Sequence, residues 1–394
     1  MSDETTETLS DVFAALGEGV TLPTDLAARA RQRGQVIRRR RIAALSAGTV
    51  ALVAGAFALT ATALSGPHRN DVRAAHYAVT GTVRVGNSPS GIAVDTVTHV
   101  IYVANSNDDN AVSTTSGTTT IVPSSRSGTV SVVDGLTDRL VATISVGSSP
   151  AGIAVNLRTH VVYVANAMSD SVSVLNGVTN QLLTTIKVAG GPSSVAVDQS
   201  TGRVYVTSLA GDSVSVIDGV TPRVIANIRV GHAPDAVAVD SAGQVVYVAN
   251  AGTGSLSVVD GTSNKLTRTV LLGAHPNGIA IDEATRTVYV TTGGDSRDTT
   301  SAVLVIDEAS NQLLKRIPVE GLAVGLSVDS KSHAVYASDN IGTAVIAIDG
   351  ATNTVEATVK VGSNPRAVGL DPVLQKLYVP NKNGTLSVVG FHAG

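Results

Sequence analysis

A pattern that recurs seven times along the chain constrains the fold more than any other feature of the sequence. Each copy opens with an apolar run, as follows: VGNSPSGIAVD (85–95), VGSSPAGIAVN (146–156), VAGGPSSVAVD (188–198), VGHAPDAVAVD (230–240), LGAHPNGIAID (272–282), VEGLAVGLSVD (319–329) and VGSNPRAVGLD (361–371). A strand-like segment centred on a tyrosine follows each run, and these are Tyr102, Tyr163, Tyr205, Tyr247, Tyr289, Tyr336 and Tyr378. The basic spacing of the tyrosines is 42 residues, a period typical of repeat architectures.

Each repeat has room for four short strands, because a third run such as SVSVIDG and a fourth such as VEATVKV follow the tyrosine segment. Four strands in about 42 residues make one blade of a β-propeller. In GIAVD, Ile and Val point to one side of the strand and Ala to the other, and the small residue suits the place where blades converge. The Gly of Asp-Gly is expected to supply the positive φ of a hairpin turn, and the Asp that ends the first run is expected to cap the next turn.

The two ends of the repeat region complement each other. The seventh copy stops at Val388-Val389-Gly390, before its fourth strand, whereas residues 79–85 at the start resemble the fourth strand at 355–361. Pairing the first strand with the last blade would close a ring and remove its free edge. The sequence therefore predicts an all-β, seven-bladed propeller over residues 77–390.

The repeats also resemble a known family. The strands VYVAN, VYVTS and VYVTT, preceded by P-x-G-I-A-V-D and followed by S-V-S-V-I-D-G, look like the YVTN β-propeller repeat, over about 80% of the chain. Members of that family include surface-layer and periplasmic proteins. The resemblance implies an exported propeller and carries no catalytic set onto this chain. The sixth repeat departs from the pattern, with Leu322 and Ala323 at the usual turn positions and Ser338-Asp339 in place of Ala-Asn.

The segment before the propeller reads as a membrane anchor. Residues 42–64 contain no charge over 23 positions, and a helix of that length just crosses a hydrocarbon core of about 30 Å. Arg38–Arg41 stand directly before it, so the positive-inside rule keeps residues 1–41 in the cytoplasm as a tail and places the propeller outside, after a linker at 65–76. Two alternatives stay open: a cleaved signal, since Ala61-Thr62-Ala63 resembles a cleavage site, and a twin-arginine export signal.

Composition narrows the classes of partner and chemistry. The formal net charge of −3 suggests neither nucleic acid nor an anionic surface as a partner. Cysteine is absent, which removes disulfides, thiolate metal sites and cysteine nucleophiles, and fits an exported protein. No serine-hydrolase elbow, P-loop or dinucleotide fingerprint occurs, so no catalytic residue, metal ligand or cofactor is assigned.

Candidate ligand-binding residues gather on one expected face of the propeller. The loop before each first strand and the loop after each tyrosine strand share this face, and both insertions in the repeats, within 106–127 and 293–300, fall there. His232 and His275 lie on this face in adjacent blades, with Asp235 nearby. The two histidines could bind an anion, bind a metal ion or transfer a proton, or they could simply be exposed turn residues. Four amides that end tyrosine strands could bind glycan or peptide, or satisfy their own loops: Asn105, Asn166, Asn250 and Asn381.

The opposite face looks structural. His99, His160 and His333 each precede a tyrosine by three residues, where other repeats have Gly, Gln or Arg, so we interpret them as solvated strand starts. The carboxylates that end the first strands recur in six repeats, which indicates turn elements and not an acid–base pair: Asp95, Asp198, Asp240, Asp282, Asp329 and Asp371.

Three functions are compatible with these features. The first is a membrane-anchored, extracytoplasmic binding module whose protein, peptide or glycan ligand docks on the insertion-bearing face. The alternative is a propeller enzyme of lactonase-like or lyase-like type, which would need His232, His275 and Asp235 to form a cluster. A sensor that signals to the cytoplasmic tail ranks last, since that tail has no recognisable signalling domain.

Overall fold

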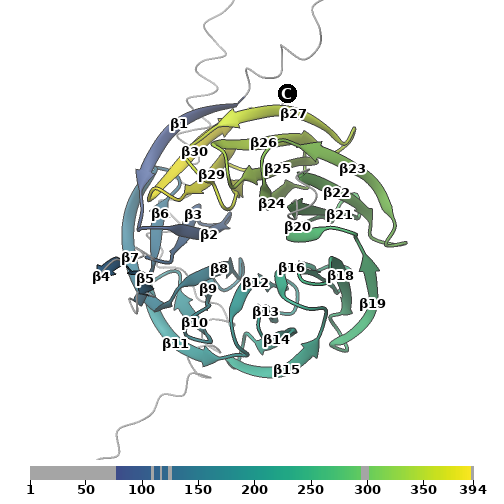
Figure 1. Ribbon diagram of the computed structural model, residues 1–394, viewed down its shortest axis with the longest axis horizontal. Coiled ribbons are helices and arrows are strands. Elements are labelled where there is room, and N and C mark those ends of the chain that lie inside the picture. Colours follow the sequence, from purple (N-terminus) through teal and green to yellow (C-terminus); the bar gives the residue numbers. More distant parts are fainter. Residues whose placement is uncertain (1–76, 108–110, 116–117, 123–126, 294–300, 392–394) are drawn as a thin grey trace, which may run out of the picture. The chain divides into compact units, whose positions relative to one another are not determined.

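The computed structural model describes residues 77–107, 111–115, 118–122, 127–293 and 301–391. These residues form seven four-stranded antiparallel sheets arranged around a central axis, together with one two-stranded hairpin (Figure 1). The predicted all-β, seven-bladed propeller is therefore confirmed. Within the described ranges no helix is long and apolar enough to cross a membrane. The expected tail (1–41), membrane helix (42–64) and linker (65–76) lie outside them.

The strands of each blade follow one order from the axis outward (Figure 1). The innermost strands of blades 1 to 7 are β2 (Pro89–Asp95), β8 (Pro150–Val155), β12 (Pro192–Val197), β16 (Pro234–Asp240), β20 (His275–Asp282), β24 (Ala323–Asp329) and β28 (Gly369–Asp371). The tyrosine strands come second, and these are β3 (Val100–Asn105), β9 (Val161–Asn166), β13 (Val204–Ser208), β17 (Val245–Asn250), β21 (Thr287–Gly293), β25 (Ala334–Asp339) and β29 (Lys376–Asn381).

The outer half of each blade is built from the last two strands of its repeat, except that blade 7 takes its outermost strand from the start of the domain. The third strands are β6 (Ser127–Asp134), β10 (Ser171–Asn176), β14 (Ser213–Asp218), β18 (Ser255–Asp260), β22 (Ser301–Asp307), β26 (Ala344–Asp349) and β30 (Thr385–Phe391). The outermost strands are β7 (Arg139–Ser148), β11 (Gln181–Lys187), β15 (Arg223–Arg229), β19 (Lys265–Leu271), β23 (Leu313–Val319), β27 (Thr354–Lys360) and β1 (Tyr77–Arg84). The hairpin of β4 (Ala111–Thr115) and β5 (Thr118–Val122) belongs to the first insertion.

The ring closes as the sequence predicts. β1, from the start of the propeller, pairs with β30 in blade 7, from Tyr77 opposite Phe391 to Arg84 opposite Thr385. The sheet extends one residue beyond the expected end at 390, and the ring of Phe391 packs against those of Tyr77 and Tyr336. The last blade thus takes its outermost strand from the first residues of the domain.

The core of the molecule lies between the blades. Tyr102 and Ala93 of blade 1 pack in one cluster with Ile153 and Val162 of blade 2, and the same kind of contact recurs around the ring. All seven repeat tyrosines have less than 2% of their surface exposed. Six of their hydroxyls donate to a carbonyl or side-chain oxygen in the next blade, as Tyr102 does to the carbonyl of Gly177 at 3.1 Å.

The third-strand glycines are required by this tyrosine contact and not by their backbone angles. A Cβ on Gly177 would lie 2.5 Å from the Tyr102 hydroxyl oxygen and 2.4 Å from the carbonyl oxygen of His160. Positive φ occurs instead three residues further on, at Asp138, Asn180, Asn264 and Asn353. The expectation that the Gly of Asp-Gly supplies the positive φ was therefore wrong, because close packing between blades selects that residue.

The glycines near the start of several innermost strands are explained by the close approach of the neighbouring blade. A Cβ on Gly91 would lie 2.2 Å from the carbonyl oxygen of Ala151, and one on Gly278 would lie 2.0 Å from that of Val324. The narrow spacing of the inner strands thus excludes larger side chains at this position.

Candidate functional site

The starts of the inner strands and the ends of the tyrosine strands lie on one face, which we call the insertion face. Pro89 is paired with Asn105 in blade 1, and Pro234 with Asn250 in blade 4. Register matching shows that residues 106–128 of blade 1 occupy the place of the four residues 167–170 in blade 2. The insertion therefore emerges from the expected face.

His232 and His275 both lie exposed on the insertion face, but they have different partners. His232 Nδ1 is 2.9 Å from Oδ1 of Asp212, and the N–H of Ala233 donates to the same oxygen. The hydrogen bonds from Ala233 and His232 lower the pKa of Asp212. His275 Nδ1 is 2.8 Å from the carbonyl oxygen of Ala251. These contacts hold each imidazole against the loop that follows the tyrosine strand of the preceding blade.

Asp235 lies further in, at the start of β16, on a β-bulge between Pro234 and Ala236. It is half-buried, and no hydrogen bond or ion pair to its carboxylate is formed by the described residues. Burial raises its pKa above the usual range of an aspartate. The structure gives no contact that joins Asp235 to His232 or His275, so the three do not form a cluster.

Asp235 belongs to a set of seven equivalent residues that we call the inner ring. Each of them directly follows the proline at or near the start of an inner strand, or Ala323 in blade 6. The inner ring consists of Ser90, Ala151, Ser193, Asp235, Asn277, Val324 and Arg366. Ser90 and Ser193 donate to carbonyls at the start of the next blade's inner strand. Asp235 and the exposed Arg366 are the charged members. Arg366 escaped the sequence analysis, although its position after Pro365 in the repeat could have revealed it.

The four asparagines are interior residues. Asn105, Asn166, Asn250 and Asn381 each have 0% of their surface exposed. Their Nδ2 atoms donate to hydroxyls of the neighbouring third strand, as Asn166 does to Ser173 at 3.0 Å. They therefore do not form an accessible ring of amides, and their contacts join the end of each tyrosine strand to the third strand of the same blade.

The opposite face is held together by contacts between blades that the sequence analysis missed. His99, His160 and His333 have positive φ, and their Nδ1 atoms lie 2.6–2.7 Å from Oδ2 of the inner-strand aspartate in the preceding blade, which is Asp371, Asp95 and Asp282 respectively. Oδ1 of each aspartate accepts N–H groups of its own turn, as expected. Gln244 of blade 4 makes the equivalent contact with Asp198 of blade 3. The histidines and the aspartates each recur at one position of the repeat, and this regularity is the sequence signal that could have revealed the contacts.

These histidine–aspartate contacts predict a pH dependence of stability. Hydrogen bonds to the aspartates raise the pKa of His99 and His160, so their stabilising effect is complete below the unfolded value of about 6.5 and is lost as the pH rises through the folded value. The pKa of Asp95 is lowered, mainly by His160 against the effect of burial, so its own contribution is lost only in strong acid. We expect the free energy of unfolding to fall as the pH rises above about 6.5.

Denaturant unfolding at several pH values measures this fall, and glutamine supplies the control. His160→Gln keeps a donor like that of Gln244, so the variant is expected to unfold with a weaker pH dependence than the parent while remaining folded. If the free energy of unfolding of parent and variant depended on pH in the same way, the ionisation of His160 and Asp95 would not be linked to folding.

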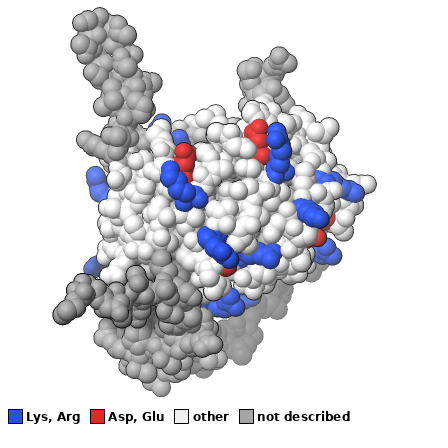
Figure 2. Space-filling model, turned by 90° about the horizontal axis from the view of Figure 1, so that it is seen from below, with Lys and Arg blue, Asp and Glu red and all other residues white. Residues whose placement is uncertain are grey.

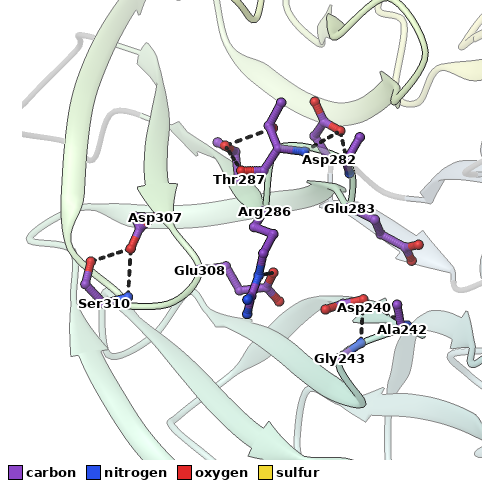
Figure 3. Close-up of polar contacts among 12 residues, drawn as sticks. Asp240, Ala242, Gly243, Asp282, Glu283, Arg286, Thr287, Asp307, Glu308 and Ser310 are labelled. Atoms are coloured by element: carbon purple, nitrogen blue, oxygen red, sulfur yellow. Dashed lines mark hydrogen bonds and ion pairs between the residues drawn. The ribbon is translucent and has the colours of Figure 1, made fainter.

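Blade 5 departs from the other blades at the tyrosine contact. Glu308 stands where most blades have glycine, and only 4% of its surface is exposed. Its Oε2 is 3.4 Å from Nε of Arg286, while its Oε1 has no hydrogen-bond partner among the described residues (Figure 3). Burial and the nearby Asp240 raise the pKa of Glu308, and Arg286 opposes them.

Replacing this carboxyl group should stabilise the protein. A buried acid with a raised pKa is most favourable to the folded state when it is protonated. This contribution to stability is lost as the pH rises through the pKa of the group in the folded protein. Glu308→Gln is therefore expected to raise the free energy of unfolding by about 1–2 kcal/mol at pH 8 and by much less at pH 4.5. Urea unfolding at the two pH values tests this, with the exposed Glu283→Gln as a control. Equal effects at both pH values would argue against the explanation.

Other surface features do not coincide with the candidate residues. Within the described residues no group of three or more His, Asp or Glu side chains is placed to hold a metal ion. Two grooves, of about 500 and 460 Å³, lie between outer strands of neighbouring blades, one lined by Val319 and Thr358 and the other by Val146 and Leu182. Neither groove contains Asp235, His232 or His275.

Comparison with known proteins bears on the fold alone. No family model and no curated protein matches the chain. Among the solved structures that match is hydrazine synthase of Kuenenia stuttgartiensis, with a TM-score of 0.66 and 19% sequence identity, over 83% of this chain and 98% of that one. At this level of identity the similarity is one of propeller architecture.

Proposed function

We propose that this propeller is a binding module whose ligand docks on the insertion face, with the inner ring at the centre of the contact. The observation that carries the proposal is Asp235, a half-buried carboxylate to which no described residue donates a hydrogen bond. Burial raises the pKa of this carboxyl group, so its charged form is incompletely hydrated, and a ligand that supplies donors offsets that loss of hydration.

The chemistry of the inner ring suggests the class of ligand. Asp235 would accept hydrogen bonds from an ammonium, amide or hydroxyl group, and Asn277 in the next blade offers both donors and acceptors. Arg366 adds an exposed guanidinium that suits a carboxylate. A peptide carries all of these groups, so we favour a peptide or protein segment, with a glycan as the second choice.

The proposed location is the outer side of a membrane. The uncharged stretch at 42–64 and the arginines before it support a retained anchor with the propeller outside. The likeness of the repeats to the YVTN family supports an exported protein.

Binding by charge-matched variants tests this proposal. The ring closes within residues 77–391, so a fragment of residues 69–394 contains every blade and is screened against arrays of peptides and glycans. For a bound ligand, Asp235→Asn is expected to weaken affinity about tenfold or more, because it removes the charged acceptor. Glu320→Gln, an exposed acid outside the inner ring, is the control.

A second variant tests the face as a whole. Replacing residues 106–128 by the four-residue loop of blade 2 (Ala-Met-Ser-Asp) preserves the blade register. The proposal requires that at least one of the two variants lowers the affinity for the ligand and that the control leaves this affinity unchanged. A ligand that binds all forms equally would place the site elsewhere.

A further inference from the structure

The rim of the propeller, which the outermost strands form, is positively charged, although the chain as a whole is not. The outermost strands carry ten exposed basic residues: Arg84, Arg139, Lys187, Arg223, Arg229, Lys265, Arg268, Lys315, Arg316 and Lys360. Their one acidic residue, Glu356, is half-buried. Figure 2 shows a side of the rim on which Lys and Arg outnumber Asp and Glu. A protein of net charge −3 therefore presents a cationic edge.

Two neighbouring blades add exposed leucines to this charge. On β19 of blade 4, Leu266 and Leu271 are 42% and 80% exposed, and on β23 of blade 5, Leu313 and Leu314 are 53% and 62% exposed. These strands also carry Lys265, Arg268, Lys315 and Arg316, and they lie on the same side of the ring (Figure 1). We call these eight residues the rim patch.

Simpler explanations account for only part of the rim patch. Charges on edge strands prevent edge-to-edge aggregation, but this does not require one sign and gives no reason for the leucines. A second copy of the chain would bring cation against cation. A soluble polyanion would pair with the basic residues and leave the leucines in water.

An anionic lipid surface satisfies both features. Basic side chains are attracted to lipid phosphates, and apolar side chains between them enter the boundary between headgroups and acyl chains. We propose that the rim patch docks the propeller edge-on against an anionic bilayer. This contact is independent of the ligand proposed for the insertion face, since it uses none of the inner-ring residues.

Vesicle flotation with the 69–394 fragment tests the proposal without the candidate anchor. The fragment is expected to bind vesicles of phosphatidylglycerol and phosphatidylcholine about tenfold more strongly than pure phosphatidylcholine, and the difference should shrink with added salt. Leu271→Ser with Leu314→Ser, and separately Lys265→Glu with Lys315→Glu, are each expected to weaken binding about fivefold or more.

Blade 3 supplies the matched control. Arg223→Glu with Ile225→Ser on β15 changes the same kinds of exposed residue outside the rim patch and should leave vesicle binding within about twofold. Thermal melting confirms that all variants are folded. Equal binding to both kinds of vesicle, or an equal loss in the blade 3 control, would overturn the proposal. So would full vesicle binding by the leucine variant together with strong binding of long-chain polyphosphate, which would indicate a soluble polyanion.

Discussion

Replacing Tyr102 with alanine is expected to lower the free energy of unfolding by about 3–5 kcal/mol. The side chain is 1% exposed and fills the space between blades 1 and 2, against Ile153, Val162 and Leu175. Its removal leaves a cavity in the contact that joins two blades, and the close approach of Gly177 cannot refill it. Urea unfolding of the parent and variant fragments gives the difference.

Phenylalanine at the same position separates packing from hydrogen bonding. Tyr102→Phe keeps the ring and loses only the bond to the Gly177 carbonyl, so a loss of about 1 kcal/mol is expected. If the alanine and phenylalanine variants lose the same stability, the hydroxyl and not the ring holds the blades together. A loss below about 1 kcal/mol for alanine would contradict the assignment of the tyrosine to the core.

Deleting β1 should have the largest effect of any change to the propeller. Its removal exposes the edge of β30 and the buried side of blade 7, and it takes away Val83, which packs with Val388 and Leu386. The contact of the Tyr77 ring with Tyr336, at 6.1 Å between centroids, is lost as well. We expect a loss on the order of 5 kcal/mol or more, comparable with the stability of a typical domain.

Size-exclusion chromatography and thermal melting of two fragments test this expectation. A fragment that starts at residue 69 retains β1 and should be monomeric, with a single cooperative transition. One that starts at residue 86 lacks the strand and should aggregate or melt far lower, since an unpaired edge invites pairing with other chains. Indistinguishable melting curves would mean that the ring does not depend on its closing strand.

The architecture could be predicted well from the sequence because the same local pattern of residues recurs seven times. Alternating apolar residues, a buried tyrosine and a turn recur at one spacing, and averaging over seven copies outweighs the departures in blade 6. Closure was also predictable, since residues 79–85 and 355–361 are visibly alike.

The candidate site was less predictable, because burial and partners between blades decide it. The asparagines look like surface residues at strand ends, yet Asn105 and Asn166 have none of their surface exposed. His99 and Asp371 are 272 positions apart, so no local pattern joins them. Glycine in Asp-Gly suggested a turn angle, whereas Gly177 is selected by the Tyr102 hydroxyl of another blade.

The amino-acid sequence by itself determined the blade, the blade number and the way the ring closes, since these follow from strand periodicity and a repeated spacing. Only the tertiary structure decided which polar groups are covered, which blades share a hydrogen bond, and that the basic residues of separate repeats share one rim. The physical reason is that strands form from neighbours in the chain, whereas burial and surface charge depend on residues that only the closed ring brings together.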